Sequence, residues 1–192
     1  MIAYLVLLFA VLSRLLPPAI HATGLGFTAV GGGLLFFGAR RSRWQTIFAV
    51  VALMATDYYL TAIIYGLQFH ARGYAVTWLW YAAICLFGHQ FLGTSGNARA
   101  EGKGASAFRV TAAVFTSATS FFLLSNFVVW TGSHMYTHTL AGLGTCYVAA
   151  IPFYANDVIS TAITAGALFG LPAFARNLAE TLRDLRNNQP LT

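Results

Sequence analysis

Seven apolar segments separated by short polar stretches constrain the fold of this chain more than any other feature. They cover residues 2–16, 27–39, 44–66, 74–92, 108–130, 139–153 and 158–174. Of the 192 residues, 58% are hydrophobic and only 8% are charged, whereas about 25% are charged in an average soluble domain. A water-soluble fold of this composition would be hard to keep in solution. We therefore expect an all-α fold, a polytopic transmembrane helix bundle.

The lengths of the segments indicate which of them span the bilayer. A helix needs about 20 residues to cross roughly 30 Å of hydrocarbon. Three segments reach this length unaided, namely 44–66, 74–92 and 108–130, and segment 2–16 reaches it with the two prolines that follow. Segments 27–39 and 139–153 are shorter and rich in small residues. We expect these two either to pack closely against neighbouring helices or to enter the bilayer part-way.

The basic residues predict the orientation, because cytoplasmic loops of membrane proteins are rich in arginine and lysine. The formal net charge is +6, and the basic residues cluster around positions 40–43, 99–109 and 176–186. If all three clusters are cytoplasmic, an even number of crossings separates consecutive clusters, so one of the last three segments should not cross. Segment 139–153 contains Pro152, and we expect it to be re-entrant or continuous with the last helix through a kink. The result is about six crossings with both termini cytoplasmic, or an outside N-terminus if segment 27–39 is also re-entrant.

The domain organisation follows from the same pattern. We expect one transmembrane domain, residues 1–175, and a polar C-terminal tail, residues 176–192, with a cytoplasmic linker at 93–107. The first segment is interpreted as a retained helix rather than a signal peptide, because no basic region precedes it and Arg14 interrupts it. Basic residues confined to short loops argue against nucleic acid as a partner. The two cysteines lie within apolar runs and imply no disulfide framework.

Histidine and aromatic side chains gather in the connections predicted to face outward. These residues are His21, His70, Trp130, His134, Tyr136 and His138. Imidazole is a common metal ligand and titrates near neutral pH, so the group could bind a metal, a metal-bearing cofactor or an anionic solute. The alternative is that these side chains anchor the loops at the level of the lipid headgroups.

A few polar residues within the apolar segments need an explanation. A bare carboxylate at Asp57 would cost on the order of 3 kcal/mol in the bilayer, so it should be protonated or paired, and Arg14 is the candidate partner. Such a pair either locks the bundle or handles a solute or proton. Asn126 could bind a ligand or hydrogen-bond between helices. Cys85, close to Tyr81, lies one turn before His89, which fits a nucleophile with its base, a soft-metal pair or a buried apolar cysteine.

Several short stretches together resemble an uncharacterised family of small bacterial inner-membrane proteins. They are LLPP at 15–18, GFTAVG at 26–31, LLFFG at 34–38, DYYL at 57–60, SNFVVW at 125–130, TLAG at 139–142 and CYVAAIPF at 146–153. More distantly, the layout resembles the S components of energy-coupling-factor vitamin transporters, and among them the solitary vitamin B12 transporters. This resemblance implies a bacterial inner-membrane location and uptake of a vitamin-type solute. It also implies cobalamin as a candidate transported ligand, with Cys85 binding the cobalt.

The functional hypothesis is therefore binding and uptake of a small solute. The expected ligand-binding residues are Asp57, His70, Tyr81, Cys85, Asn126, Trp130, His134 and His138. The expected partners are the lipid bilayer, the small-molecule ligand and either another membrane protein or a second copy of the chain. Two alternatives stay open: a structural or assembly subunit of a larger membrane complex, and an intramembrane enzyme using Asp57, His89 or Cys85.

Overall fold

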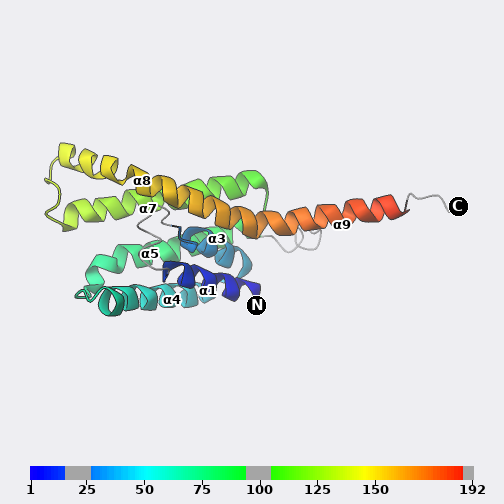
Figure 1. The fold of residues 1–192 in the computed structure, drawn as a ribbon, viewed down its shortest axis with the longest axis horizontal. Coiled ribbons are helices and arrows are strands. Elements are labelled where there is room, and N and C mark those ends of the chain that lie inside the picture. The colour runs from blue at the N-terminus through cyan, green and yellow to red at the C-terminus, as the bar shows by residue number, and fades with distance from the viewer. Residues whose placement is uncertain (16–26, 94–104, 188–192) are drawn as a thin grey trace.

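Every regular element in the described residues of the computed structural model, 1–15, 27–93 and 105–187, is a helix (Figure 1). The α-helices are α1 (Ile2–Arg14), α3 (Val30–Arg40), α4 (Thr46–Tyr58), α5 (Ala71–Phe87), α7 (Ala107–Gly132), α8 (Leu140–Ala165) and α9 (Leu171–Asn187). A 3-10 turn at Arg43–Gln45 leads into α4, and π-helical turns at Tyr59–Ile64, Gly88–Leu92 and Gly166–Gly170 extend α4, α5 and α8. The predicted all-α transmembrane bundle is confirmed.

Four continuous helices in the described part of the chain are long and apolar enough to cross a membrane. They are Arg43–Ile64, Ala71–Leu92, Ala107–Gly132 and Leu140–Arg183. Large apolar side chains such as Phe48, Leu79 and Phe115 are exposed on their outer faces, where lipid would cover them. This architecture is that of a multi-pass membrane protein.

The last of these helices decides between the two expectations for segment 139–153. Pro152 lies inside α8, and the helix continues through the π-helical turn at Gly166–Gly170 into α9. Transmembrane helices tolerate proline because neighbouring groups satisfy the backbone that it frees. The segment is therefore continuous with the last helix and not re-entrant, and α9 carries the helix through position 176, where the polar tail was expected to begin.

Helices α1 and α3 form a short antiparallel hairpin. At 1.5 Å per residue they are about 20 Å and about 17 Å long, so neither alone reaches the roughly 30 Å of a span. The Ala29 amide, just before α3, donates to Ser13 Oγ at 3.0 Å near the end of α1. At the other end the Arg41 guanidinium lies 4.5 Å from the centre of the Tyr4 ring. The six expected membrane helices are thus four long helices and this pair of short ones.

Helix α3 is the centre of the bundle. It contacts α1, α5, α7 and α8, and Figure 1 shows it between a layer of α1, α4 and α5 and a layer of α7 and α8. Every residue from 30 to 39 is buried. A Cβ atom at Gly38 would lie 1.9 Å from the Cys85 carbonyl oxygen, and one at Gly88 would lie 2.5 Å from that of Leu35. Glycine at both positions lets the backbones of α3 and α5 touch.

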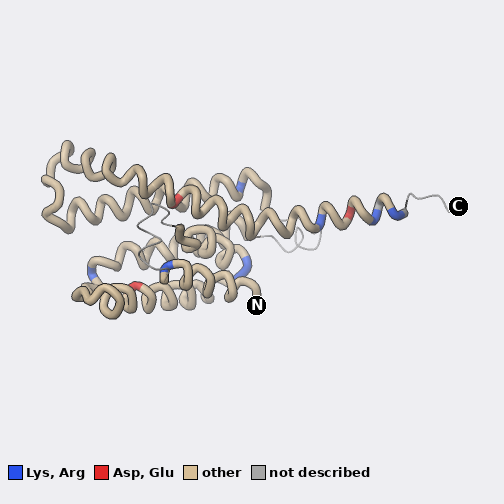
Figure 2. The backbone as a smooth tube through the Cα atoms, in the orientation of Figure 1, with Lys and Arg blue, Asp and Glu red and all other residues tan. Residues whose placement is uncertain are grey.

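The two ends of the bundle differ in charge (Figure 2). One end, called here the arginine end, holds the start of α1 and the junction between α3 and the helix Arg43–Ile64, and also the start of α7 and the α8–α9 junction. Its basic residues, among those described, include Arg40, Arg41, Arg43, Arg109 and Arg176. The opposite end, the histidine end, carries His70, His134 and His138, and Arg72 is its basic residue among those described. Both ends of the described chain lie on the arginine side, as the charge pattern predicts.

Candidate functional site

A buried ion pair joins the end of α1 to α4. Arg14 Nη1 donates to Asp57 Oδ1 at 2.5 Å and to the Tyr81 hydroxyl at 2.9 Å. Trp78 Nε1 donates to the other carboxylate oxygen, Oδ2, also at 2.9 Å. The side chain of Asp57 is 1% exposed, so both of its oxygens have partners where water cannot replace them. The expected Arg14–Asp57 pair is therefore present.

The positions of these residues in their helices explain why they meet. Arg14 is the last residue of α1, which ends inside the bundle. Asp57 lies seven residues before the end of the helix Arg43–Ile64, and Trp78 lies seven residues after the start of the helix Ala71–Leu92. Both residues are therefore about 10 Å from the histidine end. Trp78 and Tyr81 are three residues apart and share one face of α5. That spacing was the signal that could have identified Trp78, which the sequence analysis missed.

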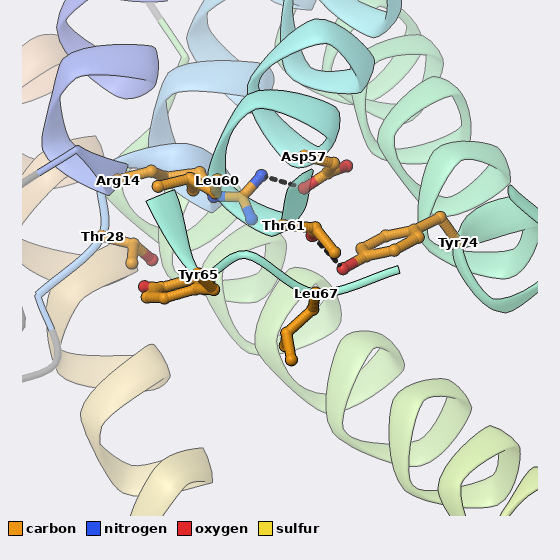
Figure 3. A pocket seen from close by; sticks show the side chains of 8 residues that line it. All are labelled: Arg14, Thr28, Asp57, Leu60, Thr61, Tyr65, Leu67 and Tyr74. Atoms are coloured by element: carbon orange, nitrogen blue, oxygen red, sulfur yellow. Dashed lines mark hydrogen bonds and ion pairs between the residues drawn. The ribbon is translucent and has the colours of Figure 1, made fainter. Parts of the chain in front are cut away.

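The ion pair lines a cavity of about 300 Å³, called here the outer cavity (Figure 3). Its lining consists of Arg14, Thr28, Asp57, Leu60, Thr61, Tyr65, Leu67 and Tyr74. Tyr65 and Leu67 are exposed and belong to the connection at the histidine end, so the cavity lies on that side of the bundle. The hydroxyls of Thr61 and Tyr74 lie 2.6 Å apart in a hydrogen bond.

Of the two charged groups that line the outer cavity, the Arg14 guanidinium is more accessible than the Asp57 carboxylate. The side chain of Arg14 is 22% exposed, against 1% for Asp57. A guanidinium has five N–H donors in a planar fork, and the hydrogen bonds of Arg14 to Asp57 and Tyr81 both use Nη1. The cavity can therefore offer a cationic donor and hydroxyl groups to a polar molecule.

The histidines of the outer face lie elsewhere. His70 is exposed, with Nδ1 3.0 Å from the Gln68 carbonyl oxygen, and His134 and His138 are exposed on the separate connection between α7 and α8. Trp130 donates to the Thr137 carbonyl at 2.9 Å, and its ring centre is 5.6 Å from that of His138. Within the described ranges no three His, Cys, Asp or Glu side chains gather where they could hold a metal ion. His21 lies outside the described residues.

Asn126 and Cys85 are engaged in contacts between helices. Asn126 donates to the Phe122 carbonyl at 2.8 Å, and its own carbonyl accepts from Cys146 of α8 at 3.5 Å. Cys85 is fully buried and accepts from Thr46 Oγ1 at 3.5 Å. His89, one turn further on, has Nδ1 2.8 Å from the Arg41 carbonyl oxygen. Neither Asn126 nor Cys85 lines the outer cavity.

Asp157 is a second intramembrane carboxylate that the sequence analysis overlooked. It was assigned to a break between two apolar segments, but it lies within α8 and is half-buried. Among the described residues it forms no ion pair. Thr161 lies one turn later in α8, and the hydroxyls of Ser117 and Thr164 are buried and lack a hydrogen-bond partner. The signal for Asp157 was the alternative that segment 139–153 continues through Pro152 into the last helix, because a continuous helix carries residues 154–157 through the membrane.

Comparisons with known proteins give one result. The sequence model of a family of unknown function (DUF6580) matches residues 1–182. No curated protein and no solved structure matches the chain.

Proposed function

This chain belongs to the family of unknown function DUF6580, and we propose that it binds a small polar solute in the outer cavity and serves its uptake. The observation that carries the proposal is the Arg14–Asp57 pair, which is held inside an apolar bundle and lines a cavity. Ionisable residues within membrane helices are costly and usually mark a functional site. A buried ion pair is also a poor way to stabilise a fold, because apolar side chains of similar size often do so better.

The size and chemistry of the outer cavity favour a small acidic solute. Its volume of about 300 Å³ is at the lower end of the roughly 300–1,000 Å³ range of small-molecule sites. Arg14 can offer a carboxylate its paired donors, and the hydroxyls of Thr61 and Tyr74 can bind further polar atoms of the solute. The neighbouring Asp57 balances the arginine, so that the site without solute is neutral.

The resemblance to S components supports uptake of a vitamin-type solute across a bacterial inner membrane. The vitamin B12 version of the proposal makes Cys85 the cobalt ligand. Cys85 is fully buried beside Thr46, in the half of α5 nearer the arginine end, so α3, α4 and α5 would have to separate before a corrinoid could reach it. A corrinoid is also too large for the outer cavity. We therefore favour a smaller acidic vitamin or metabolite.

The test uses purified protein in detergent, first by mass spectrometry for a retained ligand and then by thermal unfolding with a panel of small carboxylic acids, including acidic vitamins. A ligand at 100 times its Kd should stabilise the protein by about 2.7 kcal/mol. The variant Arg14→Gln/Asp57→Asn, which removes both charges and leaves neither unpaired, should fold but lose this gain. The exposed His134→Gln serves as the control and should respond as the native protein does.

Two outcomes would decide against the proposal. If the double variant gains as much stability from the ligand as the native chain, the pair is structural only. If no acid shifts the unfolding temperature and no ligand is retained, the outer cavity is not a solute site. For the B12 version, cobalamin-loaded protein should be red, and Cys85→Ser should change its visible spectrum.

One observation favours an assembly role as a second candidate. Helix α9 projects beyond the bundle (Figure 1), and Phe174, Leu178, Leu182 and Leu185 are exposed along it. Their spacing of three or four residues gives one apolar stripe, which suits contact with another protein. An assembly subunit should co-purify with a partner in fixed stoichiometry, and deletion of residues 177–192 should release that partner.

A further inference from the structure

A second, larger cavity lies at the arginine end, between the α1–α3 hairpin and the α8–α9 junction. Its volume is about 800 Å³, towards the top of the roughly 300–1,000 Å³ range of small-molecule sites. One part of its wall is apolar and includes Ile2, Phe36, Leu168 and Leu171. It is called here the arginine groove.

Three arginines make another part of the wall of the arginine groove basic. Arg40, Arg41 and Arg176 line it, and no acidic residue is among the described residues that line it. The Arg40 guanidinium carbon lies 5.2 Å from the centre of the Phe36 ring, and that of Arg41 lies 4.5 Å from the centre of the Tyr4 ring. The Nε atom of Arg41 is buried without a hydrogen-bond partner. Stacking on the Tyr4 ring leaves the edge of the Arg41 guanidinium, with this unpartnered Nε, available for an anion.

The position of the arginine groove matches the headgroup level of one leaflet. Arg40 ends α3, and Arg43 begins the long helix that crosses the membrane. Trp44, at the same level, is 65% exposed, as expected of an aromatic side chain at the membrane–water interface. Because arginine-rich loops face the cytoplasm, the groove belongs to the cytoplasmic leaflet.

We infer that the arginine groove binds one anionic phospholipid. The phosphate and its negative headgroup contact Arg40, Arg41 and Arg176, while the acyl chains cover Ile2, Phe36 and Leu168. Basic pockets between helices on the cytoplasmic side bind such lipids. A soluble phosphate would leave the apolar wall bare, and a zwitterionic lipid would place its ammonium group among three arginines. The bound lipid bridges α1 and α3 to the α8–α9 junction, and so joins the two layers of the bundle.

The test measures lipid binding to delipidated full-length protein by native mass spectrometry. Phosphatidylglycerol is the probe, phosphatidylcholine tests the need for a negative headgroup, and glycerol 3-phosphate tests the need for acyl chains. Each arginine near an anionic lipid contributes about 1 kcal/mol, which is about fivefold in Kd. Arg40→Gln/Arg176→Gln removes two arginines and should therefore raise the apparent Kd for phosphatidylglycerol by about 25-fold. Arg183→Gln/Arg186→Gln removes the same charge from α9 outside the groove and should change the Kd by less than about twofold.

The expected result is one tightly bound phosphatidylglycerol per chain, with weaker binding of the two other probes. Equal losses in the two double variants would overturn the inference, because the attraction would then reflect net charge alone. Equally tight binding of phosphatidylcholine would also overturn it. If glycerol 3-phosphate bound as well as the lipid, the groove would be a site for soluble phosphates. Arg40 and Arg176 are exposed, so both variants should fold, and circular dichroism checks this.

Discussion

Two aspartates lie within the membrane-spanning helices, and their surroundings differ. Asp57 is paired with Arg14 and accepts from Trp78, whereas Asp157 forms no ion pair with any described residue. Removing one partner of a buried pair costs about 3–5 kcal/mol, because the other charge is left uncompensated. An unpaired carboxylate in a membrane helix is itself costly, so its removal should have the opposite effect.

We therefore expect the same substitution to change stability in opposite directions at the two sites. Asp57→Asn should lower the free energy of unfolding by about 3–5 kcal/mol. Asp157→Asn should raise it by about 1–2 kcal/mol, since a neutral amide is cheaper to bury than a carboxylate. Denaturation by SDS in mixed micelles, followed by circular dichroism, measures both values. Destabilisation by Asp157→Asn of the size expected for Asp57→Asn would mean that Asp157 is paired in the folded protein.

The sequence predicted contacts between residues correctly where burying a charge costs the most free energy. The Arg14–Asp57 pair could be predicted because each charge needs a partner in hydrocarbon and the apolar segments contain few other ionisable residues. The contact of Tyr81 and Trp78 with that pair depends on the rotation of α5 about its axis, which hydropathy does not determine. The histidines were expected to share one face, and His70, His134 and His138 lie at the same end. They come from two separate connections, and none lines the outer cavity.

At the scale of elements, the closeness of α3 and α5 depends on a glycine. A methyl group at Gly38 would lie 1.9 Å from the Cys85 carbonyl oxygen, a backbone atom that cannot move aside alone. Gly38→Ala should therefore force the two helices apart and lower the free energy of unfolding by about 3 kcal/mol. Gly144→Ala in α8 is the matched control, because no atom lies within 4 Å of its added Cβ. Its effect should stay below about 1 kcal/mol, and the same SDS titration compares the two variants.

A small effect of Gly38→Ala, equal to that of Gly144→Ala, would show that α3 and α5 are not in backbone contact. The sequence located these helices well, because long apolar runs have few alternatives in a membrane. It could not decide whether segment 139–153 breaks at Pro152 or continues, since that depends on how neighbours satisfy the freed backbone. The small residues of segment 27–39 indicated close packing, and α3 is indeed buried on all sides.

For the whole molecule, the orientation in the membrane connects the two proposed sites. The outer cavity lies towards the histidine end and the arginine groove lies at the arginine end. Uptake from outside requires the first to face outward, and a lipid site in the cytoplasmic leaflet requires the second to face inward. One orientation satisfies both requirements, and it is the one that the arginine-rich loops predict.

Single cysteines at the two ends test this orientation. Met135→Cys lies on the connection between α7 and α8, where Met135 is 73% exposed, and Thr181→Cys lies on the exposed face of α9. The native Cys85 and Cys146 are 0% and 2% exposed, so the unsubstituted chain serves as the background. A membrane-impermeant maleimide should label position 135 but not 181 in intact cells, and 181 but not 135 in inside-out vesicles. The reverse pattern would place the outer cavity on the cytoplasmic side, where a solute-uptake site would open to the wrong compartment.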